Sequence, residues 1–413
     1  MLSAALAISL FIVGASPLNA DRVSSGAASP HGSSSRSVRA LWVARTTLTS
    51  PAAISAMVES AKQAGFNTIL VQVRGRGDAY FKDGVEPRAV ALARQSSAFD
   101  PLATTLKLAH EAGLQVHAWV NVNLVSDARG LVPHDHVVLR HPEWLMVPRE
   151  LAGDLRRVSP SSDRYLDALR QWTRAHSKQV EGLYMSPLPG ASVKHTVSVV
   201  TDLIDRYRVD GIHLDYLRYP NENFDYSAAT LRAFHSDVSS RLSPKDRDRY
   251  DARLATNPFM YADAFPRAFS DFRRAGLTLL LSSIRKAMAA RRPGLQLSAA
   301  VYPDPPTASA RKFQDWQVWL AKGLIDVACP MAYAADAPRF LEQLQAARHG
   351  ANGHPVWAGI GAYRLSAEQT VENIRTARRL GIDGIILFSY DSLIDSPAGR
   401  QPLSEIGRAA FEQ

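Results

Sequence analysis

The chain has 413 residues, of which 46% are hydrophobic, and its formal net charge is +9 at pH 7. This length and apolar content suffice for a large core and exclude a disordered chain. The basic charge favours acidic partners, but the sequence shows no basic stripe interleaved with aromatic residues, so we expect no nucleic-acid site. The single cysteine, Cys329, excludes a disulfide within the chain and a cysteine-based zinc site.

The first segment has the pattern of an export signal. Residues 2–15 form an apolar block too short for a comfortable membrane span, and Pro17 to Ala20 supply a helix break and a small residue at a cleavage position. We therefore expect residues 1–20 to be a signal peptide and the mature protein to be periplasmic or secreted, with no stable membrane span. The usual preceding positive charges are missing, so a truncated membrane anchor is the alternative. Residues 21–38, rich in Ser, Gly and Ala, predict a flexible leader.

Short β-like runs alternate with helical stretches over residues 39–413, which is typical of a parallel sheet. The predicted strands cover residues 39–44, 67–73, 114–121, 210–216, 295–302, 325–331, 355–361 and 384–390. The predicted helices cover residues 51–64, 100–112, 191–207, 275–291, 310–321, 338–348, 366–380 and 402–412. Eight such pairs predict an α/β fold, a single (β/α)8 TIM barrel with long loops after the third and fourth strands. A doubly wound sheet is the alternative.

Alternation within the fourth strand indicates which side chains face the barrel interior. In DGIHLDY, Ile212 and Leu214 would pack on the helices, whereas His213 and Asp215 would point inward. Asp215 is the last inward residue. We therefore expect it at the carboxyl-end mouth, where barrel enzymes hold their chemistry.

Polar and aromatic residues end other strands in the same way. The inward positions are Gln72 and Arg74 in the second strand, His117, Trp119 and Asn121 in the third, Ser298 and Tyr302 in the fifth, and Trp357 followed by Tyr363 in the seventh. These groups would meet on one rim. Such a rim suits a carbohydrate, because sugar hydroxyls need polar partners and apolar ring faces stack on Trp and Tyr.

Two loops, residues 122–190 and 217–274, are long enough to form functional walls or lids. The second contains the aromatic residues Phe224, Tyr226, Phe259, Tyr261 and Phe265. They predict a small satellite core, with the lining of a cleft as the alternative.

Six motifs in chain order resemble one known family. They are LVQVRGRGDAYF, FDPL with the helix leading to GLQVHAWVN, HPEWL, RYRVDGIHLDYLRYP, QDWQVWLAKGLIDVACPMAY and GIILFSY. The chain resembles the bacterial glycosyl hydrolase-like family 10, whose members are barrels, several of them exported and associated with the cell envelope. The resemblance implies a (β/α)8 barrel acting on glycans, with peptidoglycan strands as a substrate. It also places family site residues on Asp215, Asn121, Arg74 and Tyr333.

Glycoside hydrolysis needs two carboxyl groups, one to protonate the leaving oxygen and one to attack the anomeric carbon or activate water. Asp215 is the expected nucleophile or base, because Arg218 should hold it ionised. The alternative is a structural aspartate paired with an arginine such as Arg74. Asp304, after the fifth strand, is the expected acid, although PDPP is also typical of a simple turn. The segment VYPDPPTASARKF departs from the Trp-containing loop that relatives tend to carry there, which leaves the second catalytic group open.

The expected substrate-binding residues complete the rim. They are Arg74, Trp119, Asn121, His213, Arg218, Tyr219, Tyr302, Tyr333 and Tyr390. His117, His213 and Asp215 could together hold a metal, but no third histidine clusters with them, so we expect no metal and no cofactor.

These patterns predict an exported glycoside hydrolase that cleaves O-glycosidic bonds of a bacterial envelope glycan, such as peptidoglycan strands, by carboxylate acid/base chemistry. The alternative is a catalytically silent barrel that binds glycan as an envelope scaffold. A second carboxyl near Asp215 would favour the enzyme, because the mechanism needs two carboxyls roughly 5 to 9.5 Å apart.

Overall fold

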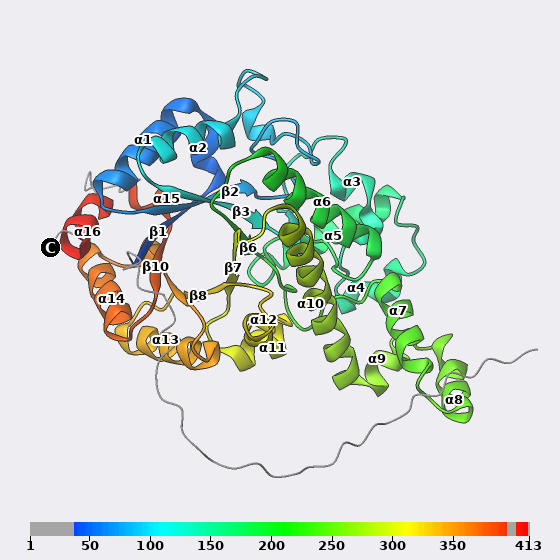
Figure 1. Ribbon diagram of the computed structural model, residues 1–413. Helices are drawn as coiled ribbons and strands as arrows, with labels where there is room; N and C mark the ends of the chain where they lie inside the picture. The colour runs from blue at the N-terminus through cyan, green and yellow to red at the C-terminus, as the bar shows by residue number, and fades with distance from the viewer. Residues whose placement is uncertain (1–36, 395–401, 412–413) are drawn as a thin grey trace, which may run out of the picture. The chain divides into compact units, whose positions relative to one another are not determined.

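The computed structural model describes residues 37–394 and 402–411 (Figure 1). Eight parallel strands close into a barrel in the order β1-β10-β9-β8-β7-β6-β3-β2, which confirms the predicted TIM-barrel fold. The strands are β1 (Val38–Val43), β2 (Thr68–Arg74), β3 (Gln115–Asn121), β6 (Gly211–Asp215), β7 (Gln296–Val301), β8 (Val327–Ala332), β9 (Trp357–Ile360) and β10 (Gly384–Phe388).

The predicted signal peptide, and the predicted leader as far as residue 36, lie outside the described residues. Strand β1 begins at Val38, so the last residue assigned to the leader belongs to the barrel. In the part of the chain that the structure describes, no helix has both the length and the hydrophobicity of a membrane span.

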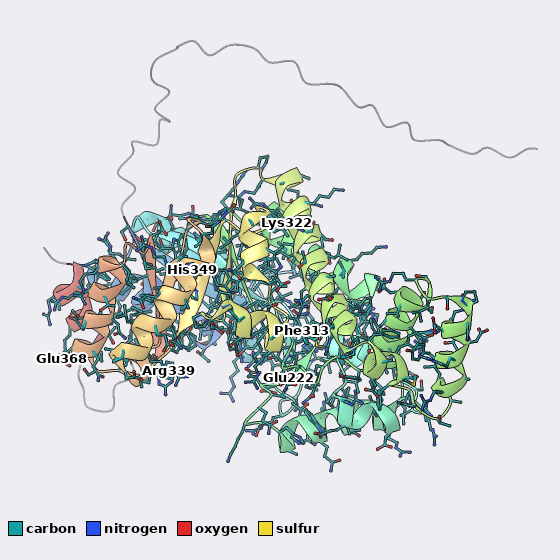
Figure 2. The ribbon with its side chains drawn as sticks, turned by 90° about the horizontal axis from the view of Figure 1, so that it is seen from below. Glu222, Phe313, Lys322, Arg339, His349 and Glu368 are labelled. Atoms are coloured by element: carbon teal, nitrogen blue, oxygen red, sulfur yellow. The ribbon has the colours of Figure 1, made fainter. Side chains whose placement is uncertain are left out.

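Helices surround the strands, and several begin where capping chemistry predicts. Ser50 and Asp100 each accept a hydrogen bond from a backbone N–H of the first turn, and proline follows each of them. The outer helices are α1 (Pro51–Gln63), α2 (Pro101–Glu111), α6 (Gly190–Arg206), α10 (Pro266–Arg291), α11 (Pro305–Lys312), α12 (Trp316–Ala321), α13 (Ala337–Ala351), α14 (Ala367–Arg379), α15 (Tyr390–Ile394) and α16 (Pro402–Phe411). Exposed charged side chains such as Lys322 and Arg339 lie on the outside of this layer (Figure 2).

Two helix predictions need correction. The helix predicted over residues 310–321 is two helices, α11 and α12, because Phe313 takes a left-handed conformation with φ 55° and ends the first. Helix α10 begins at Pro266 rather than at residue 275, since proline is well placed in the first turn.

The strands pack on both faces, as the predicted alternation requires. Ile212 and Leu214 belong to the core between strands and helices, whereas His213 points inward and accepts a hydrogen bond from Trp42 Nε1 at 3.0 Å. The inner core contains Ala40, Trp42, Leu70, Trp119, Val327, Cys329, Trp357 and Ile386. Gly211 is required beside this core, because a Cβ there would come within 2.6 Å of the His117 ring.

Residues 122–189 and 217–265 form what we call the satellite lobe (Figure 1). Its elements are β4 (Leu124–Ser126), α3 (Val137–Arg140), α4 (Arg149–Leu155), α5 (Asp163–Ala175), β5 (Leu183–Tyr184), α7 (Ala228–Ser239), α8 (Pro244–Leu254) and α9 (Met260–Ala264). Tyr226 and Tyr261 are buried in a separate apolar cluster with Trp144 and Phe234, which confirms the predicted satellite core. Phe224 packs in the main core instead.

Candidate active site

All eight barrel strands are parallel, so their carboxyl ends and the loops that follow gather at one end, which we call the mouth. Asp215 is the last residue of β6 and lies level with Asn121 of β3 in the strand register. The predicted place of Asp215 at the end of the fourth barrel strand is confirmed.

The carboxylate of Asp215 is held on one side. Its Oδ1 accepts hydrogen bonds from the backbone N–H of Tyr216 at 2.6 Å and from Arg218 Nη1 at 2.9 Å. Among the described residues no donor contacts Oδ2, and the side chain keeps 10% of its surface exposed. One oxygen is therefore fixed, and the other is open to a ligand in the mouth.

Arg218 is the buried counter-charge of Asp215. Burial alone would lower the pKa of Arg218, but the carboxylate of Asp215 and the nearby phenols raise it above its usual value. The guanidinium lies 4.0 Å from the centre of the Tyr216 ring and 5.7 Å from that of Tyr302. The predicted pairing of Asp215 with Arg218 is present.

Tyr216 bends the chain at this point. Its φ of 51° is left-handed, which a bulky residue rarely adopts. Backbone hydrogen bonds hold the bend, from Val122 N to Asp215 O at 2.7 Å and from Asn123 N to Tyr216 O at 3.2 Å. Such strain persists where the surrounding structure imposes it, often at ligand sites. Here it directs the Tyr216 N–H at Asp215.

An aromatic wall adjoins the carboxylate. Tyr333, just after β8, stacks on Phe388 with 5.5 Å between ring centres, and the half-exposed Tyr363 meets Tyr333 edge-on at 6.1 Å. Burial, and then the charge of Asp215, raise the pKa of the Tyr333 phenol well above its ordinary value. Aromatic faces beside a carboxylate suit a sugar.

Tyr302 joins the same group from β7. Its ring is half-buried and is contacted by Lys312 Nζ, 5.1 Å from the ring centre, and by Arg218. Asp215, Arg218, Tyr302 and Tyr333 are therefore the predicted site residues that the structure brings together. Their contact with a substrate stays a prediction.

Glu181, which the sequence analysis did not single out, is a carboxyl linked to Tyr216 through Tyr184, whose ring meets that of Tyr216 at 6.0 Å. Its Oε2 accepts a hydrogen bond from the Tyr184 hydroxyl at 2.7 Å. Burial raises the pKa of the Tyr216 phenol to about 12. The positive charge of Arg218 opposes this rise, and the negative charges of Asp215 and Glu181 add to it. Glu181 lies inside a long loop, and the alternation pattern that indicates site residues applies only to the ends of strands.

Three predicted rim residues lie in the barrel interior, so their place on the rim was wrong. Trp119 is 4% exposed, and its Nε1 donates to Asn121 Oδ1 at 2.9 Å. Asn121 is fully buried, since its amide nitrogen also donates to the carbonyl of Gly75 at 2.8 Å. His213 accepts at Nε2 from Trp42 and donates at Nδ1 to Ser298 Oγ at 2.9 Å, and burial lowers its pKa to about 3. It is a neutral core histidine.

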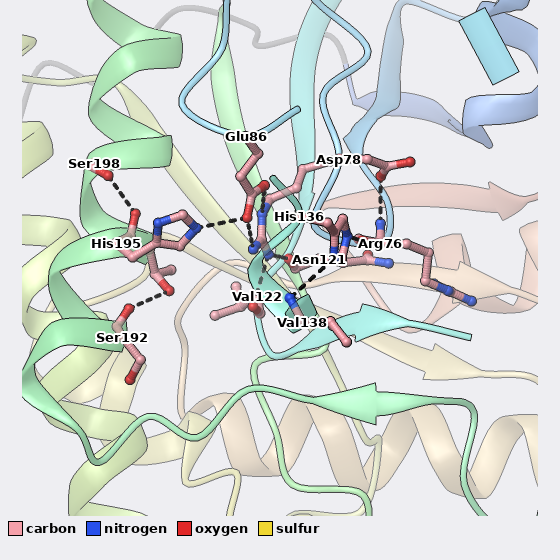
Figure 3. A network of polar contacts seen from close by, with 12 residues as sticks. Arg76, Asp78, Glu86, Asn121, Val122, His136, Val138, Ser192, His195 and Ser198 are labelled. Atoms are coloured by element: carbon pink, nitrogen blue, oxygen red, sulfur yellow. Dashed lines mark hydrogen bonds and ion pairs between the residues drawn. The ribbon is translucent and has the colours of Figure 1, made fainter. Parts of the chain in front are cut away.

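Arg74 serves a buried network instead of the mouth (Figure 3). Its guanidinium forms two 2.6 Å bonds with Glu86, whose Oε1 also contacts His195 Nε2 at 2.9 Å, and it donates to the carbonyls of Asn121 and Val122. With Arg74 1% exposed, a substrate contact does not fit this position. Arg74 is also not the partner of Asp215.

Two tyrosines that were predicted to bind substrate lie in the main core instead. Tyr219 is fully buried, packs edge-on against Phe313 with 5.1 Å between ring centres, and its hydroxyl has no described partner. Tyr390 is 2% exposed at the start of α15. Neither side chain reaches the surface of the mouth.

Asp304 lies in a turn, as the alternative interpretation of PDPP predicted, and the structure gives no sign that it is the catalytic acid. Its exposed carboxylate accepts the backbone N–H of Thr307 at 3.0 Å and so caps helix α11, which makes PDPP the turn into that helix. Three other aspartates in the loops after barrel strands also bind the backbone. Asp336 caps α13, Asp391 accepts from Ala44 N, and the buried Asp225 accepts from Val147 N.

Within residues 37–394 and 402–411, no three His, Cys, Asp or Glu side chains gather in a way that could hold a metal ion.

Comparisons with known proteins identify the family and support the fold. The family model described as glycosyl hydrolase-like 10 matches residues 37–360. The chain is 21% identical to glycosyl hydrolase YngK of Bacillus subtilis, over 89% of this chain and 70% of YngK. It is 24% identical to glycosyl hydrolase DigH of Escherichia coli, over 65% of this chain and 55% of DigH, so it spans about half of that relative. The glycoside hydrolase domain of PgaB (BpsB) from Bordetella bronchiseptica has the same fold, with a TM-score of 0.60, 15% identity and coverage of 91% of this chain and 99% of that domain.

Proposed function

Because the chain belongs to the glycosyl hydrolase-like 10 family, we propose that it is a glycoside hydrolase whose reaction centres on Asp215. The observation that carries the proposal is the carboxylate at the end of β6, with one oxygen bound by Tyr216 N–H and Arg218 and the other open to the mouth. Tyr333 and Tyr302 flank it. This arrangement supports an ionised nucleophile or base beside surfaces on which a sugar ring can stack.

Glu181 is our proposed partner acid. A glycosidase needs a second carboxyl across the scissile bond. Glu181 accepts a hydrogen bond from Tyr184, whose ring centre lies 6.0 Å from that of Tyr216, the residue next to Asp215. Asp304, the acid expected from the sequence, instead accepts a helix-capping hydrogen bond. The loop that carries Glu181 thus supplies the carboxyl that the ends of the barrel strands do not.

The substrate we propose is a glycan of the bacterial envelope, such as peptidoglycan strands, and the protein is exported. Export is supported by the apolar block at residues 2–15 followed by Ala20. The basic net charge of +9 supports an anionic polymer as substrate.

A barrel that binds glycan without cleaving it is the second candidate. It is favoured by the ion pair between Asp215 and Arg218, which would also stabilise a purely structural aspartate. Sugar release by the wild-type protein separates the two functions.

Replacing Asp215 by Asn tests the proposal. Asn keeps an acceptor for Arg218 and for the Tyr216 N–H but cannot act as nucleophile or base, so turnover should fall by about 10³-fold or more while glycan binding changes little. Asn also leaves the buried Arg218 without its counter-charge, so we expect a lower melting temperature and compare turnover at a temperature where both proteins are folded. Glu181→Gln should lower turnover by about 10²-fold or more. Purified peptidoglycan, with and without stem peptides, is the substrate, and released sugars are measured.

Asp304→Asn is the matched control. Asn caps helices as well as Asp does, so this variant should keep both its stability and its activity. Full activity of Asp215→Asn would end the catalytic assignment, and an inactive Asp304→Asn would restore Asp304 as the acid. A wild type that binds glycan and releases no sugar would support the scaffold.

A further inference from the structure

The satellite lobe contains three cavities that share lining residues. Their volumes are about 180, 380 and 600 Å³, and Arg156 lines all three. Arg157 lines the second and third, and Arg232 lines the first and second. The three cavities therefore adjoin one another around Arg156, and together we call them the arginine groove.

The arginine groove carries unpaired positive charge. Arg156, Arg157, Arg164 and Arg232 line it, all four are exposed, and none has an ion pair or a side-chain hydrogen bond with a described residue. The carboxylates in its lining are Glu143, which contacts His141 at 3.0 Å, and Asp154. Four guanidinium groups face two carboxylates, so the groove is net positive and attracts anions.

Its apolar lining combines three aromatic residues, Tyr165, Tyr226 and Phe259, with the aliphatic residues Leu155, Val158, Leu231, Leu254 and Pro258. Two of these aromatic rings are already covered, because the Arg149 guanidinium lies 5.1 Å from the ring centre of Tyr226 and 4.7 Å from that of Phe259. Single-stranded nucleic acids bind through bases stacked on free aromatic faces. This covering disfavours a nucleic acid as the occupant.

The lobe that holds the groove leaves the barrel at the mouth. Both segments of the satellite lobe leave the carboxyl ends of barrel strands, β3 and β6, so the lobe is connected at the same end of the barrel as Asp215. Tyr226, which lines the first cavity, follows Asp215 closely in the chain. A polymer seated near Asp215 could therefore extend toward the groove.

We propose that the arginine groove binds an acidic polysaccharide whose sugars carry carboxylate groups. Guanidinium forks bind carboxylates through two parallel hydrogen bonds, and the apolar lining can contact the apolar faces of sugar rings. The choice of a glycan rests on the proposed function. The groove would hold the polymer at a distance from the reacting bond, so it would affect binding of long chains and leave the chemistry at Asp215 unchanged.

The test compares two variants of the full chain with matched loss of charge. One is Arg156→Gln, Arg157→Gln and Arg232→Gln in the groove, and the control is Arg94→Gln, Arg339→Gln and Arg408→Gln, three exposed arginines outside it. The probe is polygalacturonate, with its methyl-esterified, neutral form as the matched polymer, and binding is measured by calorimetry at fixed salt. We expect the groove variant to bind polygalacturonate at least tenfold more weakly, the control to bind as wild type does, and the esterified polymer to bind every form weakly.

If both variants lose the same affinity for polygalacturonate, the loss is explained by net charge alone and the proposal is overturned. An unchanged affinity in both variants would also overturn it. Groove-dependent binding of a (dA)20 oligonucleotide or of phosphatidylglycerol vesicles as tight as that of polygalacturonate would also overturn it. Asp215→Asn should still bind polygalacturonate. If the wild type binds polygalacturonate but releases no sugar from peptidoglycan, the proposed function is refuted and the groove site is still supported. Sugar release together with unchanged binding by the groove variant refutes the groove site alone.

Discussion

At the scale of single residues, depth in the barrel separates a site residue from a core residue. Asp215 and His213 share the inward face of β6, yet Asp215 has an open carboxylate oxygen while both His213 nitrogens are bonded inside the protein. The two positions differ by one layer of inward side chains, and barrel interiors are filled in such layers. Chemistry is available only in the layer that meets the mouth.

The same distinction predicts different outcomes for two aromatic residues. Tyr363 is 51% exposed beside Tyr333, so Tyr363→Ala should weaken glycan binding about tenfold while the melting temperature stays close to that of wild type. Trp119 is packed in the inner core, and Trp119→Ala should lower the free energy of unfolding by about 3 to 5 kcal/mol. Urea melts and glycan titrations of both variants check this. A destabilised Tyr363→Ala with normal glycan affinity would contradict the aromatic wall as a binding surface.

At the scale of elements, the network of Arg74, Glu86 and His195 ties three segments together. Arg74 ends β2, Glu86 lies in the loop that follows, and His195 belongs to α6, far along the chain (Figure 3). All the bonds are short, and Arg74 and Glu86 are almost fully buried. Breaking such a pair leaves an uncompensated buried charge, which is strongly destabilising.

This network predicts a dependence of stability on pH. Burial alone would raise the pKa of Glu86, but Arg74 and His195 outweigh it and lower that pKa from 4.5 to about 2. A carboxyl whose pKa is depressed in the folded state stabilises the fold above its unfolded pKa and loses that contribution as pH falls through the folded pKa. We therefore expect the urea midpoint of the wild type to fall between about pH 4.5 and pH 2.

Glu86→Gln should lose about 3 to 5 kcal/mol of stability at pH 7 and show a smaller decline on acidification. Glu111→Gln, at an exposed glutamate of α2, is the matched control and should behave as wild type in both respects. Equal acid sensitivity of wild type and Glu86→Gln would show that other carboxyls dominate the decline.

At the scale of the whole molecule, a second core lets the barrel carry a large additional surface. The satellite lobe packs around Trp144, Tyr165, Phe234 and Phe269, apart from the barrel core. The lobe comes from two loops after β3 and β6, and helix α10 adds Phe269 to its core. The lobe contains both Glu181 and the arginine groove. Long loops at the mouth thus supply what the strand ends lack, in keeping with the way barrel enzymes vary their function.

Export is the prediction that belongs to the complete chain. The apolar block at residues 2–15, the break at Pro17 and the small Ala20 predict a mature protein that begins near Asp21 and is found outside the cytoplasm. N-terminal sequencing of the protein recovered from cell fractions measures this directly. Recovery of an intact Met1 in the cytosolic fraction would contradict it.

The sequence alone was enough to predict the barrel, the inward and outward faces of β2, β3, β6, β7 and β9, and the position of Asp215, whereas the facing of β1, β8 and β10 stayed ambiguous. Those features follow from local periodicity, since side chains of a strand alternate in direction and parallel strands end together. The satellite core was also predictable from the aromatic residues of the long loop.

The tertiary structure alone decided which inward residues reach the surface and which polar groups pair. Asn121 is level with Asp215 in the strand register. Its side-chain amide is nevertheless used inside the protein, because it accepts a hydrogen bond from Trp119 Nε1 and donates one to the Gly75 carbonyl. Arg74 binds Glu86, and Glu86 binds His195 from a helix that periodicity does not place beside it. Burial and pairing depend on contacts between segments far apart in the chain, and a pattern with a period of two residues carries no information about those contacts.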